Sequence, residues 1–242
     1  MKASCALFVL TATVFCVSGT LPLTSTPAGL PVWGPRPQAV LTNFAATVSA
    51  QNPNPSLTER AYQDREILYE LQTPDSHAFR ITHDYTVRKA GEKYYFNVVR
   101  AGSHVTNPES IDLDTGTKLK WEIISGKQAT ERKLPITDPI KDDSEIVVTH
   151  LARALAAGAT NRIRLQETYA DPKSYYLDGD ELVWDRSFGR LRNTVVLPPG
   201  WYLTALQSPA TIETLADGRV SIYVVNPRPD DVRVYLRARR RP

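Results

Sequence analysis

The chain has 242 residues, with 29 Lys and Arg against 26 Asp and Glu and a formal net charge of +3. This near-neutral balance gives no reason to expect a polyanion partner, so we expect no nucleic-acid binding. The length allows one large β domain or two domains of about 100 residues each.

Residues 1–19 have the layout of a secretory signal peptide. Lys2 is followed by an apolar run from Ala6 to Val17 and then by the small residues Ser18 and Gly19. The run is short for a membrane span and no second run of that length follows it. We therefore expect an exported protein, periplasmic or extracellular, without a transmembrane segment.

Both cysteines, Cys5 and Cys16, fall within this leader. A lipoprotein is the competing interpretation because Cys16 lies near the end of the apolar run, but bulky Phe15 precedes it where lipoprotein cleavage sites want a small residue. The mature chain then has no cysteine, which excludes disulfides, thiol nucleophiles and cysteine-ligated metals.

The next segments predict a tether, a strand and a short helix. Residues 20–38 are rich in proline and predict a semi-extended tether. Residues 39–50 have the β-branched and apolar content of a first strand. Ser56 and Glu59 have the spacing of a capping box, which predicts a short helix to about Asp64.

Alternating patterns then predict two hairpins with a strand between them. The first hairpin pairs residues 67–72 with 78–88 and places His83 inside. The single strand covers residues 93–100. The second hairpin pairs residues 111–113 with 118–124, and its second strand is expected to point Leu119, Trp121 and Ile123 inward.

The charged and proline-punctuated stretch around residues 135–144 is the expected linker between an N-terminal β half, 39–134, and a C-terminal β half, 145–242. Residues 145–158 fit either a strand or a helix, and we favour a strand followed by irregular chain. Short strands at 161–169 and 181–185 are expected to follow.

The clearest pattern lies between Asn193 and Arg239, where apolar and polar residues alternate in runs separated by Asp217-Gly218 and by proline turns. We interpret it as an antiparallel β-meander. The whole chain predicts an all-β fold, an antiparallel β-sandwich of about a dozen strands with at most one or two short helices. Whether it forms one sandwich or two stays open.

Asp114 is the most tempting catalytic candidate, because Asp114-Thr115-Gly116 after an apolar strand resembles the active-site motif of aspartic proteases. That mechanism needs two carboxylates sharing a proton, and this chain supplies one such motif. Asp-Thr-Gly is equally suited to a hairpin turn, which is the interpretation we favour.

Metal, cofactor and nucleotide chemistry find little support. The acidic turns at Asp112, Asp142 and Asp178 lack the ligand order of an EF-hand, although a weak Ca²⁺ site stays open. The four histidines lack metal-binding spacing, and P-loop, Rossmann and nucleophile-elbow patterns are absent from the sequence. We therefore expect no metal and no cofactor.

Aromatic residues near turns are the best candidates for ligand contacts. Tyr94, Tyr175, Trp184 and Trp201 each have an aromatic neighbour or lie beside a turn, so rings exposed there would stack on a ligand. The alternative is that these rings pack in the core or cover sheet edges.

Three segments carry a resemblance to known proteins: residues 76–85, 97–103 and 192–201. They look like exported bacterial β-sandwich proteins of unknown function. The strand succession is also distantly similar to the non-catalytic N-terminal β-domain of M1-type aminopeptidases. This sequence lacks the HExxH zinc motif, so the resemblance transfers no catalytic residue. It implies an exported, non-enzymatic binding or interaction module for a protein or carbohydrate ligand. The alternative is a secreted hydrolase using Asp114.

Overall fold

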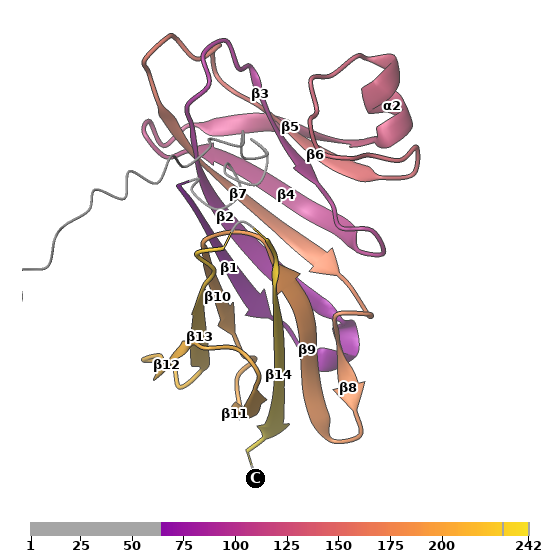
Figure 1. Ribbon diagram of the computed structural model, residues 1–242, viewed down its shortest axis with the longest axis vertical. Coiled ribbons are helices and arrows are strands. Elements are labelled where there is room, and N and C mark those ends of the chain that lie inside the picture. Colours follow the sequence, from indigo (N-terminus) through magenta and orange to yellow (C-terminus); the bar gives the residue numbers. More distant parts are fainter. Residues whose placement is uncertain (1–63, 229, 242) are drawn as a thin grey trace, which may run out of the picture. The chain divides into compact units, whose positions relative to one another are not determined.

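A computed structural model describes residues 64–228 and 230–241 (Figure 1). The expected signal peptide, tether, first strand at 39–50 and helix at Ser56 lie outside the described residues. Within them, the structure has fourteen strands, one α-helix and one 3₁₀ helix. In chain order these are β1 (Arg65–Leu71), η1 (Pro74–Ser76), β2 (Ala78–Val87), β3 (Tyr94–Val98), β4 (His104–Asp112), β5 (Lys118–Ser125), α2 (Gly126–Glu131), β6 (Glu145–His150), β7 (Asn161–Ala170), β8 (Tyr175–Asp178), β9 (Glu181–Phe188), β10 (Arg192–Val196), β11 (Trp201–Leu206), β12 (Thr211–Thr214), β13 (Val220–Val225) and β14 (Val232–Arg240).

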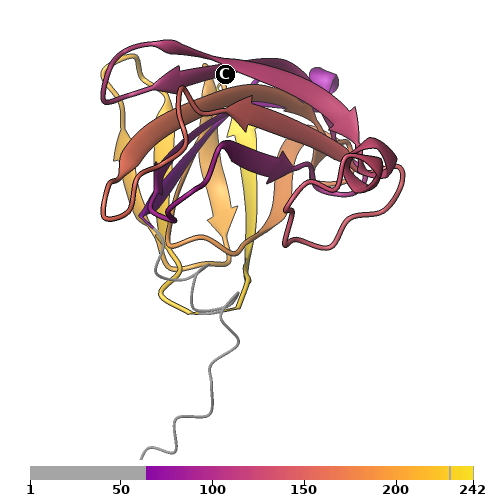
Figure 2. The same ribbon diagram turned by 90° about the horizontal axis from the view of Figure 1, so that it is seen from above.

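The strands form two sheets, which confirms the all-β sandwich. The large sheet has ten strands in the order β12-β13-β10-β1-β2-β7-β4-β5-β6-β3, and the small sheet has four in the order β11-β14-β9-β8. Strands from both expected halves are neighbours in the large sheet, for example β2 and β7. Figure 2 shows the curvature of the large sheet from above.

Local pairing follows the sequence patterns closely. The β1–β2 and β4–β5 hairpins form as expected, and residues 145–150 are a strand. Asp217-Gly218 turns β12 into β13, with Gly218 at φ +81°. A left-handed backbone angle favours glycine because it has no Cβ to clash. The β1–β10 pair is parallel, and it is the one departure from antiparallel pairing among the described strands.

The prediction that the C-terminal meander forms a single sheet was wrong. β13 pairs with β10 and β12 in the large sheet, whereas β14 pairs with β9 and β11 in the small sheet. The chain crosses between the layers after Asn226, whose side-chain amide donates to the carbonyls of Phe188 and Asp230. Alternation shows that a strand has one buried face, but it does not show which sheet the strand joins.

Aromatic side chains from both sheets interlock in the core. Tyr69 of β1 stacks on Phe188 of β9 with ring centroids 5.0 Å apart. Phe79 of β2 meets Trp184 of β9 edge to face at 4.8 Å. Such pairs add specific geometry to the burial of apolar surface, so this cluster fixes how the two sheets face each other.

A second, smaller cluster lies under α2. Ser125 caps this helix: its hydroxyl accepts from the Gln128 amide at 3.2 Å, and the Gln128 side chain accepts from the Ser125 amide at 2.9 Å. This capping box orients the helix so that Ala129 packs with Ile124 and Ile146. The sequence predicted no helix at these residues, which it placed at the end of the N-terminal β half.

Candidate functional site

A cleft opens between β4 and β5, with a volume of about 600 Å³. The two strands pair at only two positions, Ser110 with Leu119 and Ile111 with Lys118, and then separate. We call this opening the β4–β5 cleft. It is lined by Val105, Thr106, Asn107, Pro108, Glu109, Trp121 and Ile123.

The first half of β4 is irregular on the side of the cleft. Its register against β7 shifts between Thr106 and Glu109, Asn107 has φ +50°, and Pro108 has no amide hydrogen to donate. The Val105 amide donates to a side chain, Glu145 Oε2, at 2.9 Å, and not to a strand. This edge of β4 is therefore not covered by a neighbouring strand over its first half.

Trp121 and Ile123 form the other wall and are exposed by 43% and 42%. The expectation that both point into the core was wrong, whereas Leu119 on the same strand is buried. All three side chains lie on the same face, but β5 leaves β4 after Leu119 and carries the other two beyond the core. Two large exposed apolar side chains at alternate positions are an unusual surface for a chain in isolation.

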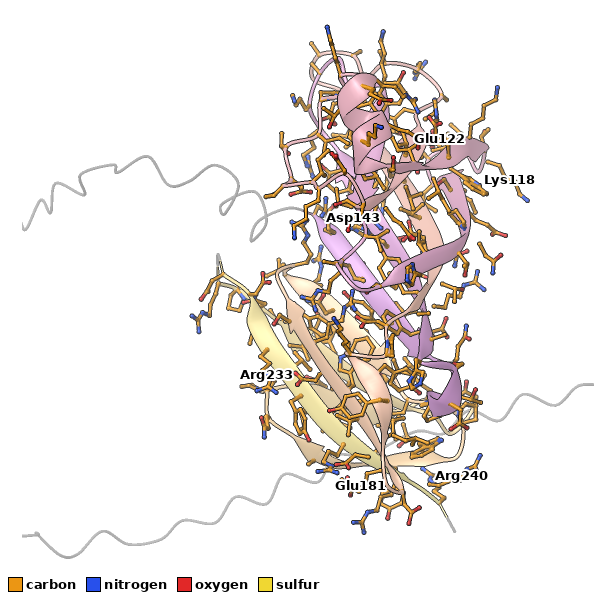
Figure 3. All side chains as sticks on the ribbon, turned by 90° about the vertical axis from the view of Figure 1, so that its right-hand side faces the viewer. Lys118, Glu122, Asp143, Glu181, Arg233 and Arg240 are labelled. Carbon is orange, nitrogen blue, oxygen red and sulfur yellow. The ribbon has the colours of Figure 1, made fainter. Side chains whose placement is uncertain are left out.

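A second depression, the end groove, lies at one end of the sandwich and has a volume of about 590 Å³. It contains Trp201, one of the predicted ligand-binding residues, beside prolines and charged groups. Trp201 is only 7% exposed, so little of its ring faces the groove. Figure 3 labels Arg240 and Glu181 in this region. The groove is lined by Gln72, Thr73, Pro74, Asp75, Leu177, Gly179, Asp180, Pro198, Pro199, Trp201, Arg239 and Arg240.

The other three predicted ligand-binding residues lie in packed regions. Tyr175 and Trp184 have no exposed surface, and the Tyr175 hydroxyl donates to the Gln72 carbonyl at 2.5 Å. Tyr94 packs against Phe96 and, edge to face, against His150 at 5.1 Å. The structure does not bring these three rings together with Trp201 in one site.

Asp114 lies in the turn between β4 and β5. Its Oδ2 accepts from the Arg162 amide at 2.9 Å and from the Asn161 side chain at 3.2 Å. Asp112 Oδ1 accepts from the Asp114 and Thr115 amides, as in an Asx turn. Both carboxylates therefore organise the turn and its contact with β7, which is the structural interpretation of the motif.

Polar side chains are buried where β3 folds over the inner face of β2 and β7. The Tyr95 hydroxyl lies 3.3 Å from His83 Nδ1, so His83 is inside as expected. The Asn97 amide donates to Glu167 Oε2 at 2.8 Å and to the Tyr169 hydroxyl at 2.9 Å. The sequence did not single out Glu167, because an acidic residue at an inward position interrupts the alternation of apolar and polar residues that identifies a strand.

Groups of acidic and histidine side chains that could hold a metal ion are absent among the residues the structure describes. In the same part of the chain, no helix is long and apolar enough to cross a membrane.

Comparison with known proteins shows a distant structural likeness. The chain is similar to an M1 zinc metallopeptidase from Deinococcus radiodurans, with 12% identity over 72% of this chain and a TM-score of 0.43. It is also similar to an aminopeptidase N family protein from Idiomarina loihiensis, with 11% identity over 71% of this chain and a TM-score of 0.39. The matches cover 41% and 29% of those two chains.

The distant similarity to M1-type aminopeptidases that the sequence suggested is a likeness of fold alone. No family model and no curated protein matches the chain.

Proposed function

We propose that this chain is a non-enzymatic binding module that takes an extended polypeptide segment into the β4–β5 cleft. The observation that carries the proposal is the pairing of an uncovered strand edge with two exposed apolar side chains, Trp121 and Ile123. Main-chain groups on a strand edge bind another strand, and alternate side-chain sites select its sequence.

The geometry of the cleft fits such a ligand. Trp121 and Ile123 are two positions apart on one strand, so their spacing matches that of alternate side chains on an added strand, about 7 Å. Val105 and Pro108 lie behind the opposite wall and are largely buried, so the exposed apolar surface of the cleft is that of Trp121 and Ile123. A partner with aliphatic side chains at alternate positions would bury these surfaces while its backbone faces β4.

A carbohydrate ligand is supported less well. Sugars stack on an exposed aromatic face. Trp201 in the end groove shows too little of its ring for that, and Tyr175 and Trp184 show none. Trp121 is exposed, but half of its neighbours in the cleft are apolar and Glu109 is the one charged group among them.

A hydrolase is also supported less well. Asp114, its least implausible catalytic group, is engaged in the turn contacts described above.

The proposal of a secretory leader is separate from the ligand, and N-terminal sequencing of the protein recovered outside the cytoplasm would test it. A mature chain that begins near residue 20 is the expected result.

Selection from a phage library of random octapeptides tests the polypeptide proposal. Peptides with alternating aliphatic residues should be enriched, and Trp121→Ala should weaken their binding by tenfold or more, about 1.4 kcal/mol. Ile212→Ser is the matched control, because Ile212 is exposed by 51% on β12, outside the cleft. Peptides that bind the Trp121→Ala variant equally well, or a glycan array with a ligand that competes at the cleft, would contradict the proposal.

A further inference from the structure

The strand β3 is one of the two edge strands of the large sheet. Like β12 at the other edge it pairs with a single neighbour, in this case β6. Its inward residues are buried by crossing the face of β2 and β7. Two side-chain contacts dock it there: Tyr95 with His83, and Asn97 with Glu167 and Tyr169.

Glu167 is the acidic member of this contact and is only 2% exposed. Its Oε2 accepts from Asn97, but its Oε1 is buried without a hydrogen-bond partner. The ion pairs between described residues do not include Glu167. A buried carboxylate without a cation is costly when ionised, whereas the neutral acid is tolerated.

Two buried arginines lie near β3, and neither forms an ion pair with Glu167. Arg65 of β1 lies over the ring of Tyr85 at 4.4 Å and over the ring of Tyr95 on β3 at 5.7 Å. Arg186 of β9 binds Asp171 at 2.7 Å. The titratable and charged side chains whose charges act on His83, Tyr95 and Tyr169 beside Glu167 are Arg65 on β1, Tyr85 on β2, Arg186 on β9 and Arg190 after β9.

We propose that β3 is a proton-controlled flap. With Glu167 protonated, β3 stays docked across β2 and β7, and with Glu167 ionised it separates more often both from this face and from β6, which exposes its backbone amides. Undocking lets the carboxylate reach water and uncovers the buried polar surface around His83 and Tyr95. The device is independent of the ligand proposed for the β4–β5 cleft.

The direction of the effect follows from the proton balance. Burial raises the pKa of Glu167 to about 7, against opposing hydrogen bonds from Tyr169 and Asn97. In the undocked state the pKa returns toward its ordinary value of 4.5. The docked state therefore binds the proton more tightly. The fraction of undocked molecules rises as the pH increases from 4.5 to about 7. Between about pH 5 and 8 the undocking constant should increase about 70-fold.

His83 would act in the opposite direction. Burial and the nearby Arg65 hold the pKa of His83 well below its usual value. Protonation of His83 would favour undocking at low pH, because the docked state prefers the neutral ring. The sign of the pH dependence therefore distinguishes the two groups.

Hydrogen exchange of the full chain, followed by mass spectrometry and corrected for the intrinsic pH dependence of exchange, tests the flap. Protection of peptides covering residues 93–99 should fall about 70-fold between about pH 5 and 8. Peptides from β9 should not show this fall. Equal loss of protection in β3 and β9 would mean global unfolding and would overturn the proposal, as would a pH-independent β3.

The variant Glu167→Gln supplies the second arm. Its amide oxygen still accepts from Asn97, but the side chain cannot ionise, so the pH dependence of β3 should vanish. Glu213→Gln, a change at an exposed position on β12, should keep the wild-type dependence. An unchanged slope in Glu167→Gln would overturn the proposal. If that variant does not fold, the comparison of β3 with β9 in the wild-type chain still decides it.

Discussion

Asp171 and Arg186 form a buried ion pair that joins the two sheets. Arg186 Nη1 lies 2.7 Å from Asp171 Oδ2, and the two side chains are 7% and 4% exposed. Asp171 follows β7 in the large sheet, whereas Arg186 lies on β9 in the small sheet. Asp171 also accepts from the Ser103 hydroxyl at 3.0 Å and the Ser174 amide at 3.2 Å. The pair is therefore anchored in both layers.

Asp171→Ala should lower the free energy of unfolding by about 3–5 kcal/mol, because it leaves the Arg186 charge buried without its partner. Urea denaturation followed by circular dichroism measures the change. Asp230→Ala is the control, since Asp230 pairs with Arg228 at the surface and should shift the midpoint little. A small effect of Asp171→Ala would mean that water reaches Arg186 readily.

The same pair predicts a loss of stability in acid. Burial acts to raise the pKa of Asp171, but hydrogen bonds from Ser174 and the charge of Arg186 outweigh it and hold the pKa below its usual value. The folded pKa is depressed, so this contribution is present above the unfolded value and is lost as the pH falls through the folded one. Urea midpoints measured downward from pH 5 should therefore fall less steeply in Asp171→Asn than in the wild type.

Truncation of two tryptophans should lower the stability to very different extents. Trp184 is fully buried between the sheets, so Trp184→Ala should cost about 3–5 kcal/mol through lost burial and a cavity. Trp121 is exposed by 43%, so Trp121→Ala should cost much less. Thermal unfolding of both variants measures the difference. A large loss in Trp121→Ala would place that ring in the core and remove the basis of the β4–β5 cleft.

Strand positions were predictable where short hairpins carry their own alternation. β1 with β2 and β4 with β5 needed only neighbouring residues and a turn between them. Sheet membership was not predictable, because β13 and β14 show the same alternation although they lie in different layers. Period-2 patterns report a buried face and nothing about the partner that covers it.

The candidate site was less predictable than the fold. Trp121 belongs to a regular apolar row that begins at buried Leu119, so its exposure depends on where β5 separates from β4. That separation follows from the irregularity at Asn107 and Pro108, and these two residues were the available signal. The helix α2 was missed although Ser125 and Gln128 have capping-box spacing, because proline and charge nearby suggested a loop.

Asp114→Ala should weaken the turn between β4 and β5 by about 1 kcal/mol, because it removes an acceptor for the Arg162 amide and the Asn161 side chain. A general peptidase assay at acid pH should show no activity before or after the change. Asp180→Ala, in a different turn, serves as the control for stability. Activity that disappears specifically in Asp114→Ala would establish the hydrolase alternative.

Gly126→Ala tests the tight packing at the start of α2. A Cβ added at Gly126 would lie 1.8 Å from the Lys141 carbonyl oxygen, so the backbone at residue 141 must move. The Gly126 amide also donates to the Ser144 carbonyl at 2.8 Å, which leaves the glycine little room to move instead. We expect a loss of about 1–3 kcal/mol and faster hydrogen exchange in α2. Lys127→Ala, on the exposed side of the same helix, should change neither measurement. Unchanged stability in Gly126→Ala would show that the 141–144 segment can move away from the helix at little cost.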